Sequence, residues 1–366
     1  MPDRLLSGPF LRTTAANFFF FLNFASFFLL PLHIRELGGS ESMIGAVMGT
    51  NGLASMAVLP LVGIWIDRLG RRAFLLLGAV GMTGASIGFL LFDQLGWVLF
   101  ALRALQGASF AAAFTATTTF AAEFAPRAQR ARALGLFGLS TLLTHAIAPG
   151  LGEEIVRRGG FPALFATATV CTVIAFVLGL SLQDPRAAAQ RSIASADRRL
   201  APEHWLIAAT MTLAGMGFGT VITFISTFVT SLSLGRVGIF FAAYTSTAIL
   251  TRLVGAGLSD SLGRRRVIVP SLVVLGLAIA WISTVNSLPI LFAAGALFGT
   301  AQGISYPTLH AYLVDCSSEA QLGRSQALFN GAFNLGVTTS GFAFGLLAEH
   351  YGYRPMFLVA AVTPIA

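Results

Sequence analysis

Two short basic turns carry the charged groups whose spacing repeats along this chain. The first reads Asp67-Arg68-Leu69-Gly70-Arg71-Arg72, and 193 positions later nearly the same phrase returns as Asp260-Ser261-Leu262-Gly263-Arg264-Arg265. The glycine permits a tight turn with positive φ, and the carboxylate can accept hydrogen bonds from the exposed N–H groups of a facing helix N-terminus. The chemistry available at these turns is therefore hydrogen bonding at a helix end.

Three further groups with chemistry of their own, Arg103, Arg252 and His145, stand inside apolar runs. A charge there is costly unless it meets a partner or a water-filled cavity, so both arginines are functional candidates. His145 is the best candidate for a titrating proton carrier, because no Asp or Glu lies deep in an apolar run; a hydrogen-bonded packing role is the alternative. Metalloprotease, nucleophile-elbow and P-loop patterns are absent from the sequence, so we expect no enzyme, no metal and no cofactor.

The elements that must position these groups are apolar runs of about 20 residues, the length at which a helix crosses a bilayer. Of the 366 residues 55% are apolar and 10% charged, and the mean hydropathy is +0.79, which indicates a polytopic membrane protein. The sequence predicts an all-α membrane protein with twelve helices, the last of them incomplete. The predicted spans are 10–32, 42–62, 73–92, 97–119, 133–152, 161–182, 204–231, 237–257, 267–286, 289–313, 326–347 and from 354 onward.

Arginine is distributed unevenly over the loops between these runs. If the N-terminus is cytoplasmic, sixteen arginines fall on the cytoplasmic side and five outside, as the positive-inside rule requires. This orientation accounts for the net charge of +8 without a nucleic-acid partner. We therefore expect a multi-pass membrane protein, surrounded by lipid bilayer, with its N-terminus in the cytoplasm.

The repeat extends beyond the basic turns. Gln106-Gly107 returns as Gln302-Gly303 after 196 positions, and Gly160-Phe161-Pro162 returns as Gly352-Tyr353-Arg354-Pro355 after 192. Three matches in chain order at nearly one offset predict two related halves, 1–182 and 204–366, joined by a cytoplasmic linker at 183–203. At the same offset the twelfth span would run to about residue 374, so we expect the sequence to be truncated.

Residues 63–72 resemble, at each defining position, the loop between helices two and three of the major facilitator superfamily. The chain as a whole is similar to the bacterial sugar- and drug-efflux branch, which implies a twelve-helix fold of two pseudo-symmetric halves. In that family the loop helps hold the outward-facing state closed at the cytoplasmic side; Gly63 would let backbones approach, and Asp67 would accept from a facing helix N-terminus. The alternative is that the arginines only set topology. The predicted gating residues are Gly63, Asp67, Arg68, Gly70, Arg71, Arg72, Glu123, Arg252, Asp260, Gly263 and Arg264.

Other motifs of the resemblance give candidates for the substrate or proton pathway. Residues 103–107 resemble the family's Arg-x-x-Gln-Gly pattern, which is linked to proton transfer or binding, although Arg103 could instead snorkel to the interface. The segment around Pro149 resembles an antiporter pattern imperfectly, because Ala148 and Glu153 stand where glycines are usual. Asn330 and Asn334 could equally serve helix packing. The predicted pathway residues are Asn23, Arg103, Gln106, His145, Pro149, Glu153, Gln302, Tyr306, Asn330 and Asn334.

Together these features predict a secondary transporter that moves a small organic solute by alternating access. We expect a monomer that exports its substrate against inward proton flow. A proton-coupled or facilitative importer is the alternative, because nothing in the sequence fixes direction. A non-transporting membrane sensor is a remote alternative, since the linker leaves no room for a soluble domain.

Overall fold

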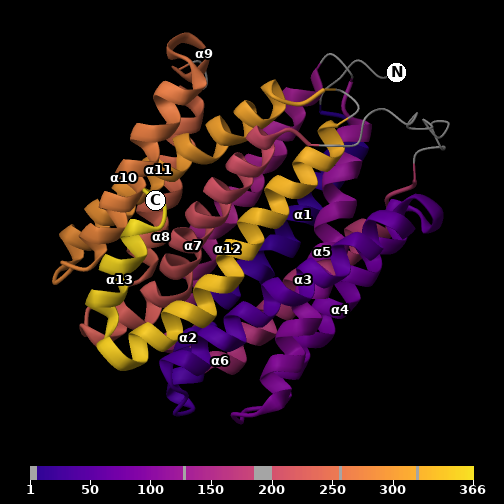
Figure 1. The fold of residues 1–366 in the computed structure, drawn as a ribbon. Helices are drawn as coiled ribbons and strands as arrows, with labels where there is room; N and C mark the ends of the chain where they lie inside the picture. Colours follow the sequence, from indigo (N-terminus) through magenta and orange to yellow (C-terminus); the bar gives the residue numbers. More distant parts are fainter. Residues whose placement is uncertain (1–5, 127–128, 185–199, 255–257, 319–320) are drawn as a thin grey trace. The chain divides into compact units, whose positions relative to one another are not determined.

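The fold is built from helices alone throughout the residues that the computed structural model describes, which are 6–126, 129–184, 200–254, 258–318 and 321–366 (Figure 1). Backbone N–H and C=O groups find no partners in hydrocarbon, so a helix, which bonds them internally, is what a long apolar run must form. The helices are α1 Gly8–Ser26, α2 Leu30–Glu36, α3 Glu41–Leu69, α4 Arg71–Leu91, α5 Trp97–Phe124, α6 Arg130–Leu180, α7 Pro202–Ser231, α8 Gly238–Val254, α9 Leu258–Leu262, α10 Arg264–Ile282, α11 Leu288–Asp315, α12 Leu322–Tyr351 and α13 Tyr353–Val362, with the 3-10 turn η1 Phe27–Leu29 between α1 and α2.

Each predicted span corresponds to a helical segment. Nine helices in the described residues are long and apolar enough to cross a membrane, with α1, η1 and α2 forming one of them. The predicted spans 133–152 and 161–182 both lie in α6, and the shorter apolar helices α8 and α13 match two more. The predicted all-α, multi-pass architecture is confirmed.

Two compact units divide the chain. Unit 1 comprises Met1–Gly38 and Thr50–Ala189, and unit 2 comprises Gly39–Gly49 and Gln190–Ala366. In unit 1, α1 packs against α6, and α4 packs against α5 and α6; in unit 2, α7 packs against α12, and α10 packs against α11 and α13. In Figure 1, α10 and α11 run side by side in orange. Equivalent helices therefore pack against one another in both units, as a duplicated fold requires. The boundaries of the two halves given by the sequence stay a prediction.

Phenylalanine fills much of the interior of both units. In unit 1, Phe21 and Phe24 of α1 meet Phe110 of α5 at ring-centroid distances of 5.5 and 4.7 Å. In unit 2, Phe218 of α7 stacks on Phe298 of α11 at 6.0 Å. Aromatic pairs at these separations add about 0.5–1.5 kcal/mol beyond the area they bury. They hold together the helices that carry the polar groups described next.

Candidate functional site

The first basic turn, residues 67–72, joins α3 to α4 through Gly70, whose φ of 90° confirms the predicted left-handed turn. The carboxylate of Asp184, beyond the end of α6, accepts hydrogen bonds from the backbone nitrogens of Arg71 at 2.8 Å and Arg72 at 3.1 Å. A side chain at position 70 would overlap this carboxylate. Asp184 thus supplies both the acceptor and the negative charge that the N-terminus of α4 favours.

Ion pairs tie the same turn to its neighbours. Arg71 Nη2 lies 3.0 Å from Glu123 Oε1 at the end of α5, so this ion pair joins two of the predicted gating residues. Arg72 Nη2 donates to the carbonyl of Leu180 at 2.8 Å. The Arg71 and Glu123 side chains are 23% and 30% exposed, which places the pair where it can exchange with water.

Four predicted gating residues at the turns have other outcomes. The side chains of Asp67 and Asp260 lie outside the described residues, and Arg68 is exposed. Gly63 makes no close approach, because a Cβ there would meet no atom of the described chain within 4 Å. The expected backbone contact at Gly63 is therefore wrong in this structure, where position 63 lies on an exposed part of α3.

The second basic turn, residues 260–265, repeats this arrangement in unit 2. Gly263 has a φ of 89°, and Arg264 Nε lies 2.9 Å from Asp315 Oδ2 at the end of α11. Arg264 also donates to Ser259 Oγ at 2.6 Å. Arg265 donates to the hydroxyl of Tyr312 at 2.7 and 2.9 Å. Each unit therefore holds the first residue of a basic-turn helix by a carboxylate at the end of the following helix.

Sequence reasoning missed Asp184, Tyr312 and Asp315. A signal for Asp315 was present, since it follows Glu123 by 192 positions, the offset already seen in the other repeats. Asp184 carried no such signal, because its partners lie 112 and 113 residues away.

A buried polar group occupies α5 of unit 1. Arg103 is 4% exposed, and its Nη1 donates to Gln106 Oε1 at 2.7 Å, so it does not snorkel to the interface. One residue on, Gly107 packs so closely against α3 that a Cβ would overlap the carbonyl oxygen of Asn51. The Arg103, Gln106 and Gly107 pattern thus combines a buried cation with a close helix contact.

Asn23 of α1 serves helix packing. Its side chain is fully buried, and its Nδ2 donates to Ser86 Oγ of α4 at 2.8 Å and to the carbonyl of Ala168 of α6 at 2.7 Å. These bonds join three helices, so Asn23 contributes to helix packing, and its place in the pathway stays a prediction.

α6 carries the antiporter-like segment. His145 is half-buried with its ring 5.2 Å from that of Phe28, Pro149 is buried, and Glu153 is half-buried. Gly152 packs against Leu29, which supports the expected close helix contact in this segment.

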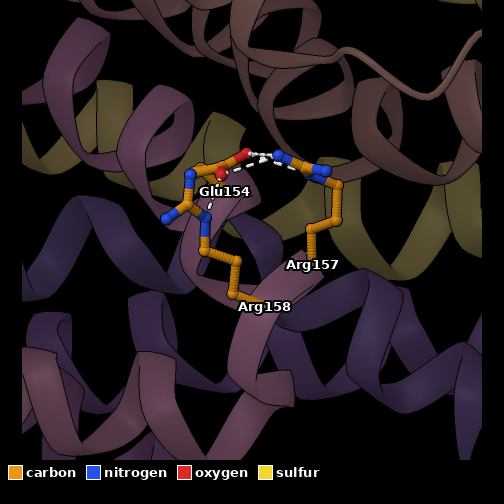
Figure 2. Close-up of polar contacts among 3 residues, drawn as sticks. All are labelled: Glu154, Arg157 and Arg158. Carbon is orange, nitrogen blue, oxygen red and sulfur yellow. Dashed lines mark hydrogen bonds and ion pairs between the residues drawn. The ribbon is translucent and has the colours of Figure 1, made fainter.

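An exposed ion cluster follows on α6. Figure 2 shows Glu154 between two arginines: it accepts from Arg157 Nε at 2.9 Å and from Nη2 at 2.7 Å, and it also pairs with Arg158. The two arginines are 71% and 77% exposed, and an ion pair this exposed adds little to stability.

In unit 2 the predicted pathway residues gather between α8, α11 and α12. Tyr306 donates to Asn330 Oδ1 at 3.4 Å, and Asn334 Nδ2 donates to the carbonyl of Asn330 at 2.9 Å. Arg252 lies within electrostatic range of Tyr306, so it belongs to this polar group as much as to the second basic turn. Gln302 is buried on the same face of α11 as Tyr306.

Within the described residues, no group of His, Cys, Asp or Glu side chains is arranged to hold a metal ion. The polar groups are arginines, amides and phenols on apolar helices, which suits them to binding and ion-pair exchange. An assembly of membrane-crossing helices with such groups inside is the architecture of a membrane transporter.

Comparison with known proteins identifies the family. The model of the Major Facilitator Superfamily matches residues 13–235 and 207–366, so the chain belongs to this superfamily and is a secondary transporter. The staphylopine export protein of Staphylococcus aureus (strain Mu50 / ATCC 700699) is 24% identical over 98% of this chain and 94% of its own length.

Two solved structures share the fold. The nucleoside transporter NupG has a TM-score of 0.78 at 16% identity, covering 98% of this chain and 97% of NupG. A D-xylose-proton symporter has a TM-score of 0.77 at 15% identity, covering 97% of this chain and 96% of the symporter. The relatives are transporters and not enzymes, and at this identity the structural neighbours indicate the fold alone.

Proposed function

We propose that this protein exports a small organic solute across the bacterial inner membrane in exchange for protons, as a monomer working by alternating access. The N-terminus and both basic turns lie in the cytoplasm under this proposal. The arginine distribution supports the orientation. The export protein of Staphylococcus aureus, which this chain matches over nearly its whole length, supports the direction.

The observation that best supports a transport cycle is the ion pair that occurs in both units. Arg71–Glu123 in unit 1 and Arg264–Asp315 in unit 2 hold equivalent helix ends, at 3.0 and 2.9 Å. Partly exposed pairs of this kind contribute about 0–1 kcal/mol each. Contacts so weak favour one conformational state by no more than about fivefold each, so they can break once per cycle.

Proton coupling needs a group that titrates along the path. His145 on α6 is the proposed carrier, since it is half-buried and lies two turns from Glu153 on the same helix. An imidazole has an ordinary pKa near working pH, which a buried arginine does not.

An importer is the second candidate function. The fold is shared with a D-xylose-proton symporter, whose name describes coupled movement of solute and proton in one direction. The same helices could support either direction, so the experiment must read direction as well as coupling.

The experiment is proton movement in everted membrane vesicles, followed with a pH-sensitive dye while drugs, sugars and organic acids are added in turn. Export by proton exchange predicts that a substrate partly collapses an imposed gradient that is acidic inside. Vesicles from cells lacking the protein serve as the control. A gradient unaffected by every compound, together with counterflow of a labelled solute, would replace the proposal with facilitated transport.

A further inference from the structure

A buried histidine near the end of α2 has no part in the proposed transport cycle. His33 is 5% exposed, and its Nε2 atom lies 3.3 Å from Oδ1 of Asp93, which belongs to residues 92–96, the connection between α4 and α5. Nε2 nevertheless makes no hydrogen bond to any described residue. A buried imidazole thus faces a carboxylate at close range without a hydrogen bond between them.

Two phenylalanines of α6 fix the position of the imidazole ring. Its centroid lies 4.7 Å from that of Phe161 and 5.2 Å from that of Phe165. Phe165 also contacts Phe89 on the last turn of α4, at 5.6 Å. Aromatic rings at such distances pack favourably and also attract a cation. The ring that faces Asp93 is therefore held in place, and its surroundings tolerate a positive charge.

The charges near His33 are few. Asp93 is the charged group within electrostatic range of the imidazole, and Asp93 in turn lies within range of Glu36, one turn further along α2. Arg35 of the same helix is exposed. On α6 the residues that contact the ring are aromatic, and the exposed ion cluster of that helix pairs within itself. The protonation state of His33 thus depends chiefly on its burial and on one carboxylate.

Protonation determines whether this contact becomes a hydrogen bond. An imidazolium carries an N–H group on both ring nitrogens, so Nε2 can then donate a charge-assisted bond to Asp93. The side chain of Asp93 is 71% exposed and is free to turn toward the donor. Burial of the imidazole opposes the charged form and the carboxylate favours it, so the two forms can exchange as the pH changes.

We propose that His33 and Asp93 form a proton-binding site that controls a contact between α2 and the α4–α5 connection. The protonated pair holds the connection, and loss of the proton from His33 releases it as the pH rises. Under the orientation in the proposed function, on which this part of the inference rests, the site faces the outside of the cell. It adds a second titrating histidine to the proposed carrier His145, on the side from which protons would enter.

The test is NMR spectroscopy of the full-length protein in detergent, with the Cε1 atoms of histidine labelled with carbon-13. The chain has five histidines, and His33→Gln identifies the signal of His33 by its loss. The site predicts that this signal titrates between about pH 5 and 8. Asp93→Asn should lower the proton affinity of His33 about three- to tenfold, because the charged form loses its counter-ion.

Two controls accompany this titration. The signals of the other histidines appear in the same spectrum and should titrate in Asp93→Asn as they do in the parent. Glu36→Gln is the matched variant, because it removes a neighbouring carboxylate that does not contact the imidazole. It should leave the titration of His33 nearly unchanged, and an effect as large as that of Asp93→Asn would refute the pairing.

A double-mutant cycle tests whether the proton stabilises the contact. Survival after heating is compared at about pH 5 and 8 for the parent, His33→Gln, Asp93→Asn and the double variant. The site predicts that at the lower pH each change lowers the midpoint by about 2 °C more in the parent than where the other group is already absent. At the higher pH this difference should vanish, whereas a packing role alone would give the same difference at both.

The site is overturned if His33 does not titrate in this range, if its titration is the same in the parent and in Asp93→Asn, or if the coupling does not depend on pH. The site and the proposed function can fail separately. Vesicles without any transport, together with the expected titration of His33, would refute the function and leave the site. Proton-coupled transport together with a His33 signal that ignores Asp93 would refute the site and leave the function.

Discussion

Alanine at position 107 should force α3 and α5 apart. The added Cβ would overlap the carbonyl oxygen of Asn51, which is backbone and cannot rotate away. Overpacking of this kind costs about 1–3 kcal/mol, against a helix-propensity gain of about 0.5–1 kcal/mol for alanine over glycine. The net effect expected for Gly107→Ala is a loss of up to about 2 kcal/mol and displaced Gln106.

Gly84→Ala is the control for the same chemical change. Gly84 lies in the middle of α4, in the same unit, and a Cβ there meets nothing within 4 Å of the described chain. This variant should be neutral or slightly more stable. The difference between the two variants isolates the contact between α3 and α5.

The assay is survival of the folded protein after heating in detergent, read by size-exclusion chromatography. At about 2–4 °C per kcal/mol, the midpoint for Gly107→Ala should fall several degrees below that for Gly84→Ala. Equal midpoints would refute the packing argument and, with it, the reason given for the Gln106-Gly107 pattern.

Three other outcomes are expected. Asp184→Asn should destabilise the first turn of α4 by about 0.5–1 kcal/mol, because the N-terminus of α4 loses a negative charge. The backbone amides of Arg71 and Arg72 should then exchange hydrogen faster, and unchanged exchange would contradict this prediction. Glu123→Gln should slow transport about two- to fivefold without reducing the amount of protein in the membrane, and a wild-type rate would remove the ion pair from the cycle. His145→Ala should flatten the pH profile of transport, and an unchanged profile would exclude His145 as the carrier.

Much of the fold was predictable, because in a membrane protein the length of each apolar run indicates a spanning helix and the charge of the loops indicates its orientation. Every predicted span has its helix, including the two that Gly160 joins within α6. The duplicated sequence also anticipated the repeated helix pairing. These features depend on the local sequence, so they could be predicted from it.

The polar contacts were less predictable, for a physical reason. Asp184 caps a helix more than 110 residues away, and nothing in the surrounding Gln183 or Pro185 indicates such a partner. Gly63 looked like a packing glycine by its motif, yet its surroundings are open. Asn23 and Asn51 are both asparagines within apolar helices, and only the positions of their neighbours distinguish their roles. Nδ2 of Asn23 bonds to Ser86 on another helix, whereas Nδ2 of Asn51 has no hydrogen-bond partner among the described residues.

The two units share one more feature, at the connection between two consecutive helices. Gly160 inside α6 and Gly352 between α12 and α13 have φ values of 71° and 82°, so one left-handed residue replaces a loop in both. A connection of one residue leaves few dihedral angles free, so we expect the two helices of each pair to move together. For protein engineering this means that tags, cleavage sites and spectroscopic labels belong elsewhere on the chain.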